Sequence, residues 1–184
     1  MRILYIYIVL ICSISFAQTS LDSTIPKHQI GIGISKFVNS AFTSDKNAYS
    51  INYRYALTEK IHVRGGALYE NDDSEGGFTD FGIKLGADKI IKNYTKWHFY
   101  YGIDVMTNYN NYKNINKNQY MLGIMPFLGI QFNLSQNFSF TVEPGFYVRH
   151  NIVVDHATFS NDNRNSWTES GLGKLGYVNL NFHF

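Results

Sequence analysis

Residues 178–184 alternate strictly between apolar and polar side chains and finish on Phe184. In an extended strand this alternation places every apolar side chain on one face and every polar side chain on the other. An unpaired strand edge favours aggregation in water and is very costly in lipid, where no water satisfies its backbone groups. The end of the chain therefore indicates a strand that seals a closed sheet.

The same alternation, bounded by turn residues, recurs along the chain. Most of the alternating segments have roughly the 9–11 residues that a tilted strand needs to cross a bilayer. We place the strands at roughly Gln29–Val38, Ala48–Leu57, Ile61–Asn71, Phe78–Asp88, Trp97–Asn108, Gln119–Leu134, Phe138–His150 and Gly171–Phe184. The sequence predicts an all-β fold, an up-and-down antiparallel transmembrane β-barrel of about eight strands.

Connections of two lengths join these segments. The turns Thr58–Lys60 and Ser135–Asn137 are short, and Lys89–Lys96 is of modest length. The other connections are mostly longer and rich in Asn, Asp and Ser: Asn39–Asn47, Asp72–Gly77, Tyr109–Asn118 and Asn151–Ser170. Short turns on one side and longer loops on the other are typical of outer-membrane barrels.

The polar face of the predicted strands carries charges of both signs, separated by glycines. These residues are Arg54, Arg64, Glu70, Asp80, Lys84, Asp88, Asp104, Glu143 and Arg149. Near balance of charge suits a narrow lumen, because an unpaired buried charge is very costly. We therefore predict lipid on the apolar face and an ion network inside. Pro126 and Pro144 cannot donate to a ladder and predict bulges in their strands.

Residues 1–17 have the features of a cleaved signal peptide, which leaves an outer-membrane barrel domain at 18–184. They combine a positive start, an apolar run at Ile3–Ile14 and a small-residue cleavage site ending at Ala17. The single cysteine, Cys12, lies in this segment, so we expect no disulfide or thiol chemistry in the domain. A formal net charge of +2 without a basic run gives no case for nucleic acid.

In this pattern the chain resembles the small eight-stranded bacterial outer-membrane barrels, such as the OmpA transmembrane domain and OmpX, and more loosely the porin-family barrels. The resemblance covers Gln29–Phe184 and rests on strand pattern, loop asymmetry and the terminal strand. It implies a bacterial outer-membrane location, contact with membrane lipid and assembly by the barrel-insertion machinery. In that family the machinery reads the terminal aromatic strand, which implies this role for Leu180, Phe182 and Phe184. Fold analogy carries no activity with it.

We expect a non-enzymatic protein with a structural role or a surface-interaction role through its outer loops. Aromatic residues in the predicted loops are candidate contacts for an unknown surface ligand: Tyr109, Tyr112, Phe159 and Trp167. Interfacial or packing roles are the alternative for these residues. A small pore is disfavoured, because about eight strands leave an interior filled by side chains. A soluble, secreted lipocalin-like binding barrel would also show alternation, with its faces inverted.

A lipid-modifying enzyme is a further alternative. The longest predicted loop contains a possible Ser/His/acid set in His156, Ser160 and Glu169. Side chains on a strand share a face at i and i+2, and the spacing of His156 and Ser160 in a loop does not fit this. We therefore expect no catalytic residues.

Inward-facing histidines near one rim of the barrel could together bind zinc: His62, His98 and His183. The favoured interpretation is that each is hydrogen-bonded separately in a wet lumen. We therefore expect neither a metal nor a cofactor.

Overall fold

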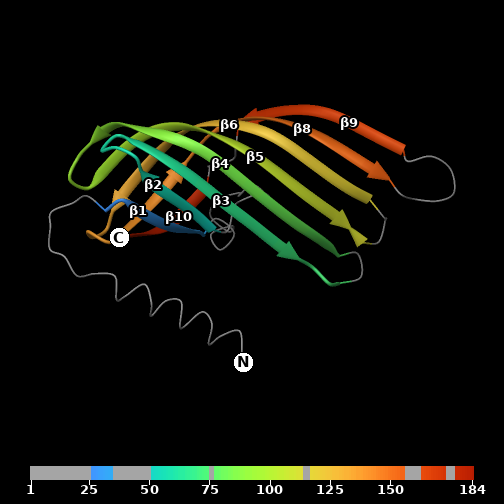
Figure 1. Cartoon of the computed structure of the whole chain (residues 1–184), viewed down its shortest axis with the longest axis horizontal. Helices are drawn as coiled ribbons and strands as arrows, with labels where there is room; N and C mark the ends of the chain where they lie inside the picture. Colours follow the sequence, from blue (N-terminus) through green and yellow to red (C-terminus); the bar gives the residue numbers. More distant parts are fainter. Residues whose placement is uncertain (1–25, 35–50, 75–76, 114–116, 156–162, 173–176) are drawn as a thin grey trace, which may run out of the picture.

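The computed structural model describes residues 26–34, 51–74, 77–113, 117–155, 163–172 and 177–184 (Figure 1). These segments contain the strands β1 (His28–Gly33), β2 (Ile51–Ala56), β3 (Ile61–Asn71), β4 (Phe78–Asn93), β5 (Trp97–Tyr112), β6 (Lys117–Asn133), β7 (Phe138–Glu143), β8 (Phe146–Asp155), β9 (Asn163–Leu172) and β10 (Tyr177–His183). Among the described residues, no helix is long and apolar enough to cross a membrane. The predicted all-β fold is confirmed.

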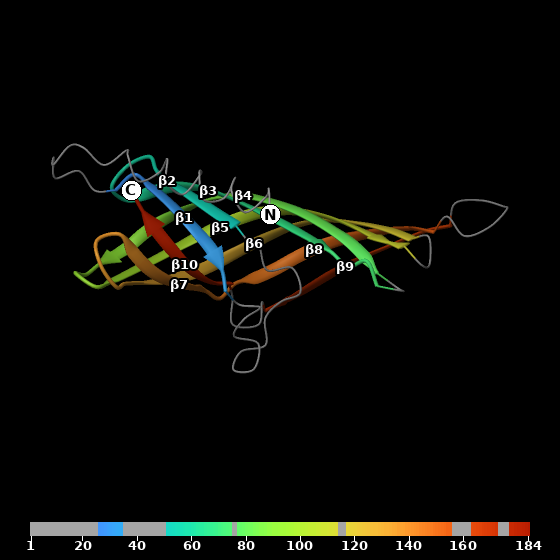
Figure 2. The same ribbon diagram turned by 90° about the horizontal axis from the view of Figure 1, so that it is seen from below.

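The strands close into a ring. Each strand from β1 to β6 pairs antiparallel with the next. β6 then pairs with both β7 and β8, which are two parts of one strand, and β10 and β9 pair with these two parts on the other side. β10 returns to β1, and the two lie side by side near the C-terminus (Figure 2). The result is the predicted closed, up-and-down antiparallel barrel of eight strands.

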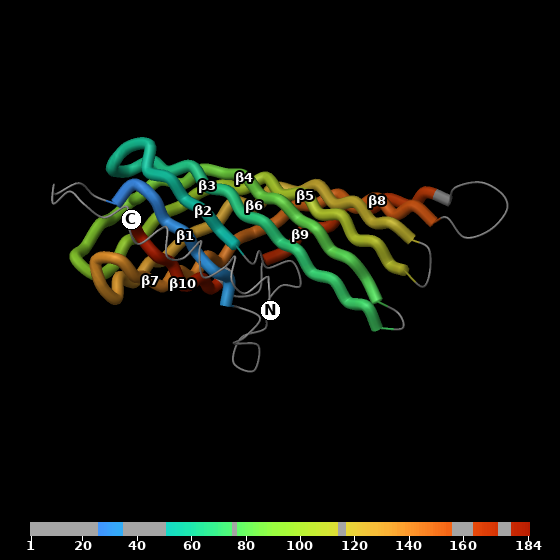
Figure 3. The backbone as a smooth tube through the Cα atoms, turned by 60° about the horizontal axis from the view of Figure 1, so that its bottom comes forward, coloured from blue at the N-terminus to red at the C-terminus, as the bar shows by residue number. Residues whose placement is uncertain are grey.

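The two ends of the barrel differ. Short turns join β2 to β3, β4 to β5 and β6 to β7 at the end where the C-terminus also lies (Figure 3). We name this the turn end. At the other end, the long-strand end, β3 to β6 and the pair β8 and β9 extend beyond β1 and β2 (Figure 3).

The prediction of one long loop over Asn151–Ser170 is wrong. β8 continues to Asp155 by pairing with β6, and β9 pairs with β8 over Asn163–Leu172. The sequence of β9, NRNSWTESGL, has few apolar residues, so the alternation that marks the other strands is absent. Most of its side chains are exposed. Backbone pairing rather than hydrophobic burial therefore specifies this strand.

The two prolines lie at one irregularity in the sheet. Pro144 separates β7 from β8, but the pairing with β6 keeps one register on both sides of Pro144, so the bulge predicted there is wrong on the β6 side. The bulge predicted at Pro126 is wrong, because the register of β6 with β5 continues through it without a shift. β6 pairs with β8 as far as Ile124 and with β7 from Ile130 onward. Pro126 lies in the interval between these two pairings, where fewer ladder bonds need its missing N–H.

The barrel is polar inside and apolar outside, as predicted. Ile51 and Leu128, on the outer face, are 58% and 60% exposed. Lys84 and Asp104, on the inner face of β4 and β5, are only 1% and 0% exposed. Alternation places the polar and apolar side chains on opposite faces of each strand. The balanced charges and glycines of the polar face predict that this face points inward.

Phe184 completes the seam between the first and last strands. The backbone N–H of Phe184 donates to the carbonyl of His28 at 2.9 Å, and the N–H of His28 donates back at 3.0 Å. The Phe184 ring stacks on the His28 ring with a centroid separation of 5.3 Å. The C-terminal residue therefore contributes both backbone pairing and ring contact to closure of the barrel.

Deletion of Phe184 removes the backbone pair and the stacked ring, whereas Phe184→Leu retains the backbone pair. We expect the deletion to lower the free energy of unfolding by about 1–3 kcal/mol and the substitution to lower it by less. Urea unfolding of the protein folded in detergent micelles measures both. Equal losses would assign the effect to the ring and contradict a contribution from backbone closure.

Candidate functional site

A buried ion pair spans the centre of the barrel. Arg64 on β3 donates from Nη1 to Oε1 of Glu143 at 2.7 Å and from Nη2 to Oε2 at 2.5 Å. In the ring of strands, β3 and β7 lie on opposite walls. The bidentate pair therefore crosses the full width of the lumen. Such paired geometry is the strongest form of a charge-assisted hydrogen bond.

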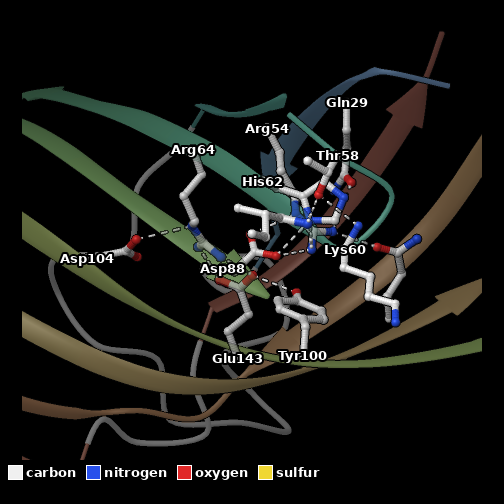
Figure 4. A network of polar contacts seen from close by, with 12 residues as sticks. Gln29, Arg54, Thr58, Lys60, His62, Arg64, Asp88, Tyr100, Asp104 and Glu143 are labelled. Carbon is white, nitrogen blue, oxygen red and sulfur yellow. Dashed lines mark hydrogen bonds and ion pairs between the residues drawn. The ribbon is translucent and has the colours of Figure 1, made fainter. Parts of the chain in front are cut away.

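Further side chains complete this central layer (Figure 4). Asp104 Oδ1 lies 3.2 Å from Nε of Arg64, and its Oδ2 lies 3.7 Å from Nζ of Lys84. The Tyr100 hydroxyl donates to Oε1 of Glu143 at 2.7 Å. Two carboxylates thus meet two cations in a region without solvent exposure, and their charges balance.

Aromatic rings pack against the guanidinium groups of Arg64 and Arg54. The Arg64 guanidinium carbon lies 4.3 Å from the ring centroid of Phe127, and that of Arg54 lies 4.4 Å from the ring of Tyr100. These contacts are cation–π interactions. The Tyr100 and Phe127 rings also meet edge to face. Inward-facing aromatics are therefore part of the ion network rather than separate from it.

A second layer lies closer to the turn end. Arg54 on β2 binds Asp88 on β4 through Nε at 2.8 Å and through Nη2. Its Nη1 donates to Oε1 of Gln131 on β6 at 3.2 Å. β2 and β6 are also opposite walls of the ring. Side chains therefore bridge the lumen at two levels.

An apolar layer separates this network from the long-strand end. Leu68, Met106, Met121 and Met125 form a buried cluster, with Tyr147 packed against it. Sequence reasoning did not identify this cluster, although Met106 falls in phase with the polar face. Methionine on an inward position was the available signal, since its flexible thioether fills irregular gaps.

Six of the nine residues predicted for the ion network meet in the Arg64 and Arg54 layers, which do not include Glu70, Asp80 and Arg149. Arg149 on β8 is partly exposed and donates from Nε to Oε1 of Glu169 at 2.6 Å. Glu70 is half-buried on β3, opposite Asp80 in the register. Asp80 accepts from Nδ2 of Asn108 at 3.2 Å. Glu70 and Asp80 lie toward the long-strand end, beyond Leu68 of the apolar cluster, whereas Arg149 pairs with Gly123 at the level of that cluster.

The predicted loop positions of the candidate ligand-contact aromatics are wrong wherever the structure describes them. Tyr109 and Tyr112 lie on β5, and Trp167 lies on β9. Phe159 lies outside the described residues. Asparagine-rich sequence around Tyr109 and Tyr112 resembled a loop, but these residues pair in register with β6. The side chain of Trp167 is 40% exposed at the long-strand end.

The three rim histidines each have their own partners. His62 Nδ1 lies 3.0 Å from Oδ1 of Asp88, His98 Nε2 lies 3.2 Å from Nδ2 of Asn133, and His183 Nε2 lies 2.8 Å from Oγ of Ser139. Within the described segments, no group of three or more His, Cys, Asp or Glu residues is arranged to hold a metal ion. His156 and Ser160, weighed above as catalytic residues, lie outside those segments.

The predicted insertion residues share the outer face of β10. Phe182 contacts Phe138 and Phe184, with ring centroids 5.3 Å and 5.8 Å apart. Leu180 lies two residues before Phe182, on the same face of β10 and opposite Phe140. The three predicted residues therefore form a continuous apolar row that ends at the turn end of the barrel.

Two ion pairs with an exposed lysine lie in the described residues of the long-strand end, Lys113 with Asp73 and Lys117 with Asp155. Nζ of Lys113 donates to Oδ1 of Asp73 at 2.5 Å, and this hydrogen bond lowers the pKa of the Asp73 carboxyl below its usual range. The Asp73 side chain is 80% exposed. Pairs this open to water contribute little to stability, so the folding energy of the charged residues resides in the lumen.

No protein-family model and no curated protein matches this chain.

Loss of the Glu143 charge should test how strongly the barrel depends on its central pair. Glu143→Gln leaves Arg64 buried beside one remaining carboxylate, and we expect a loss of about 3–5 kcal/mol in the free energy of unfolding. The control Glu59→Gln changes an exposed residue in the turn between β2 and β3 and should alter stability by no more than about 0.5 kcal/mol. Equal urea midpoints for the two variants would contradict a paired lumen.

Gly129 makes room for the Tyr100 ring. A Cβ atom at Gly129 would lie 2.2 Å from two carbons of that ring, whereas one at Gly65 would lie 3.5 Å from the nearest atom, Cδ2 of Leu85. We expect Gly129→Ala to destabilise the fold by about 1–3 kcal/mol. Gly65→Ala should have a much smaller effect. Adding Tyr100→Ala should reduce the further loss caused by Gly129→Ala, which a double-mutant cycle measures.

Proposed function

We propose that this protein is an integral outer-membrane β-barrel without enzymatic activity, with a structural or surface-interaction role at its long-strand end. The observation that carries the proposal is an apolar outer band over β1 to β7 and β10, bordered at both ends by aromatic residues. The outward residues of β9 are mostly polar and interrupt this band. Bands of this kind, flanked by aromatic girdles, are typical of transmembrane barrels. The polar, cross-linked interior supports the same proposal, because a soluble binding barrel needs an apolar interior and a wet exterior.

The border at the long-strand end is a row of aromatics in register. Tyr69 pairs with Phe81, Phe81 with Tyr109, and Tyr109 with Tyr120, on four neighbouring strands. The next outward-facing row is polar and consists of Asn71, Thr79, Asn111 and Asn118. Tyrosine favours the membrane–water boundary, since its ring is apolar and its hydroxyl is polar. The change from aromatic to polar side chains marks the proposed membrane boundary at the long-strand end.

The border at the turn end is a second aromatic group. Trp97 lies 4.5 Å from Phe132 between ring centroids. Phe138, Phe182 and Phe184 continue the group across β7 and β10. The turns beyond it are polar and exposed. This group marks the proposed membrane boundary at the turn end.

The distance between the two borders fits a bilayer. From Trp97 to Tyr109 the outward face of β5 advances 12 residues (109 − 97). At about 3.3 Å per residue this is about 40 Å along the strand, or about 30 Å along the barrel axis for a tilt of about 40°. The apolar band of outer-membrane barrels is about 25 Å tall, and the girdles lie at its edges.

The interior favours a closed barrel over the pore alternative. The bridges from Arg64 to Glu143 and from Arg54 to Gln131, with the methionine cluster beyond them, fill the lumen at successive levels. Among the described residues the network uses its charged groups for pairing with each other. The proposed roles are therefore stabilisation of the membrane and contact with a surface ligand.

A lysine on the proposed lipid face tests the location directly. Ile83 lies on the outer face of β4 at mid-band, and Thr79 lies on the same face of β4 beyond the aromatic border. We expect Ile83→Lys to cost about 2–4 kcal/mol in bilayers and to reduce membrane-inserted protein. Thr79→Lys should have little effect. The measurement is the heat-dependent shift in gel mobility of folded protein in outer-membrane fractions.

In a soluble barrel an added lysine at Ile83 would be harmless, because the position would face water. Normal folding of both variants, together with recovery of the parent in the soluble periplasmic fraction, would refute the membrane proposal. Conductance recordings and mass analysis of lipid A in expressing cells test the pore and enzyme alternatives.

A further inference from the structure

The turn end of the barrel contains a cavity of about 450 Å³. Its floor is the Arg54 layer, and its walls include Gln131, Asn133 and His98. Lys27 and Lys96 lie at its rim. The volume lies within the range of about 300–1,000 Å³ that is usual for small-molecule sites. The ion network described above uses the floor but leaves the walls and rim without an assigned role.

A directed chain of hydrogen bonds runs along the wall. Arg54 Nη1 donates to Oε1 of Gln131 at 3.2 Å, and Nε2 of Gln131 donates to Oδ1 of Asn133 at 2.8 Å. Nδ2 of Asn133 then lies 3.2 Å from Nε2 of His98. A guanidinium can only donate, so Arg54 sets the orientation of both amides. Every bond in the chain therefore points the same way.

This direction fixes the tautomer of His98. Because the amide nitrogen of Asn133 donates, Nε2 of His98 accepts, and the neutral ring carries its proton on Nδ1. Successive bonds in such a chain polarise one another. This series of hydrogen bonds begins at the permanently charged guanidinium of Arg54 and ends at the imidazole of His98, whose Nδ1–H is a donor.

Cations reinforce this donor character. Lys96 lies in the turn two residues before His98 and lines the same cavity, and the Lys96 carbonyl accepts from the N–H of Asn133 at 2.8 Å. Lys27 enters the rim from the segment before β1. Lys27, Arg54 and Lys96 supply three positive charges. Two carboxylates oppose them, that of Glu59 at the rim and that of Asp88, which pairs with Arg54. The balance is one net positive charge with neutral histidines (3 − 2).

We propose that this cavity binds a small, soluble oxyanion, with Lys96 and the Nδ1–H of His98 as its principal contacts. An oxyanion has several acceptor oxygens and negative charge, and it complements the cationic rim and the N–H donor of His98. The proposal does not rest on membrane insertion, because the cavity is built from the barrel interior and its turns.

Titration with inorganic phosphate tests the proposal on the full-length protein folded in a non-ionic detergent. We expect saturable binding by calorimetry at constant ionic strength, weakened at least threefold by Lys96→Gln. The matched control Lys113→Gln removes an equivalent charge at the opposite end and should leave binding unchanged. Retained heat-dependent gel mobility establishes that each variant is folded.

The tautomer provides an independent readout. Long-range ¹H–¹⁵N correlation spectra should place the proton of His98 on Nδ1 and should show its resonance shifting with phosphate. Asn133→Leu breaks the chain, so it should weaken phosphate binding and release the tautomer preference. Absence of saturable binding, equal weakening by both lysine variants, or an Nε2-protonated His98 in the parent would overturn the proposal.

Discussion

The bidentate contact between Arg64 and Glu143 is the interaction around which the interior is organised. The central part of a closed sheet of this size has little room for hydrated ions, so each inward charge there needs a partner on another strand. The pair joins walls that lie four strands apart in the ring, and Asp104, Lys84 and Tyr100 attach to it from the remaining side. The lumen can therefore remain narrow because its positive and negative charges balance.

In the same layer, small inward-facing residues lie opposite large ones and make room for them. Tyr100 and Phe127 are large, and Gly129 and Gly102 face them. Without these glycines, the rings that lie against Arg54 and Arg64 would collide with the wall of the barrel. Glycine in a strand usually marks close approach of another group, and here that group is an aromatic ring that shields a guanidinium from water. Packing and charge pairing therefore constrain the same positions.

Much of this architecture could be predicted from the sequence, for a definable reason. Where one face of a strand is apolar, alternation identifies the strand and its two faces, so it predicts β2 to β5. The inward position of Arg54 and Asp104 follows from the balanced charges and glycines on the polar face, because alternation does not say which face points inward. β9 has no alternation of apolar and polar residues, because both of its faces are largely exposed, so its sequence predicts a loop. The methionine cluster and the cross-barrel partners depend on register and curvature. Those arise from pairing between distant segments, which alternation within one strand does not encode.

The seam between β1 and β10 has a consequence for the order of assembly. Every other contact between neighbouring strands joins segments that are close or moderately close along the chain, whereas Gln29 pairs with His183 at the two extremes of the described sequence. The entropy of loop closure rises with the length of chain enclosed, and non-local pairing is slow to form. The hairpins therefore have a kinetic advantage over the seam. Until it forms, the molecule is an open sheet with two free edges, each able to accept a strand from another chain. Closure is then the last event of folding and the one that separates a solitary barrel from an aggregate.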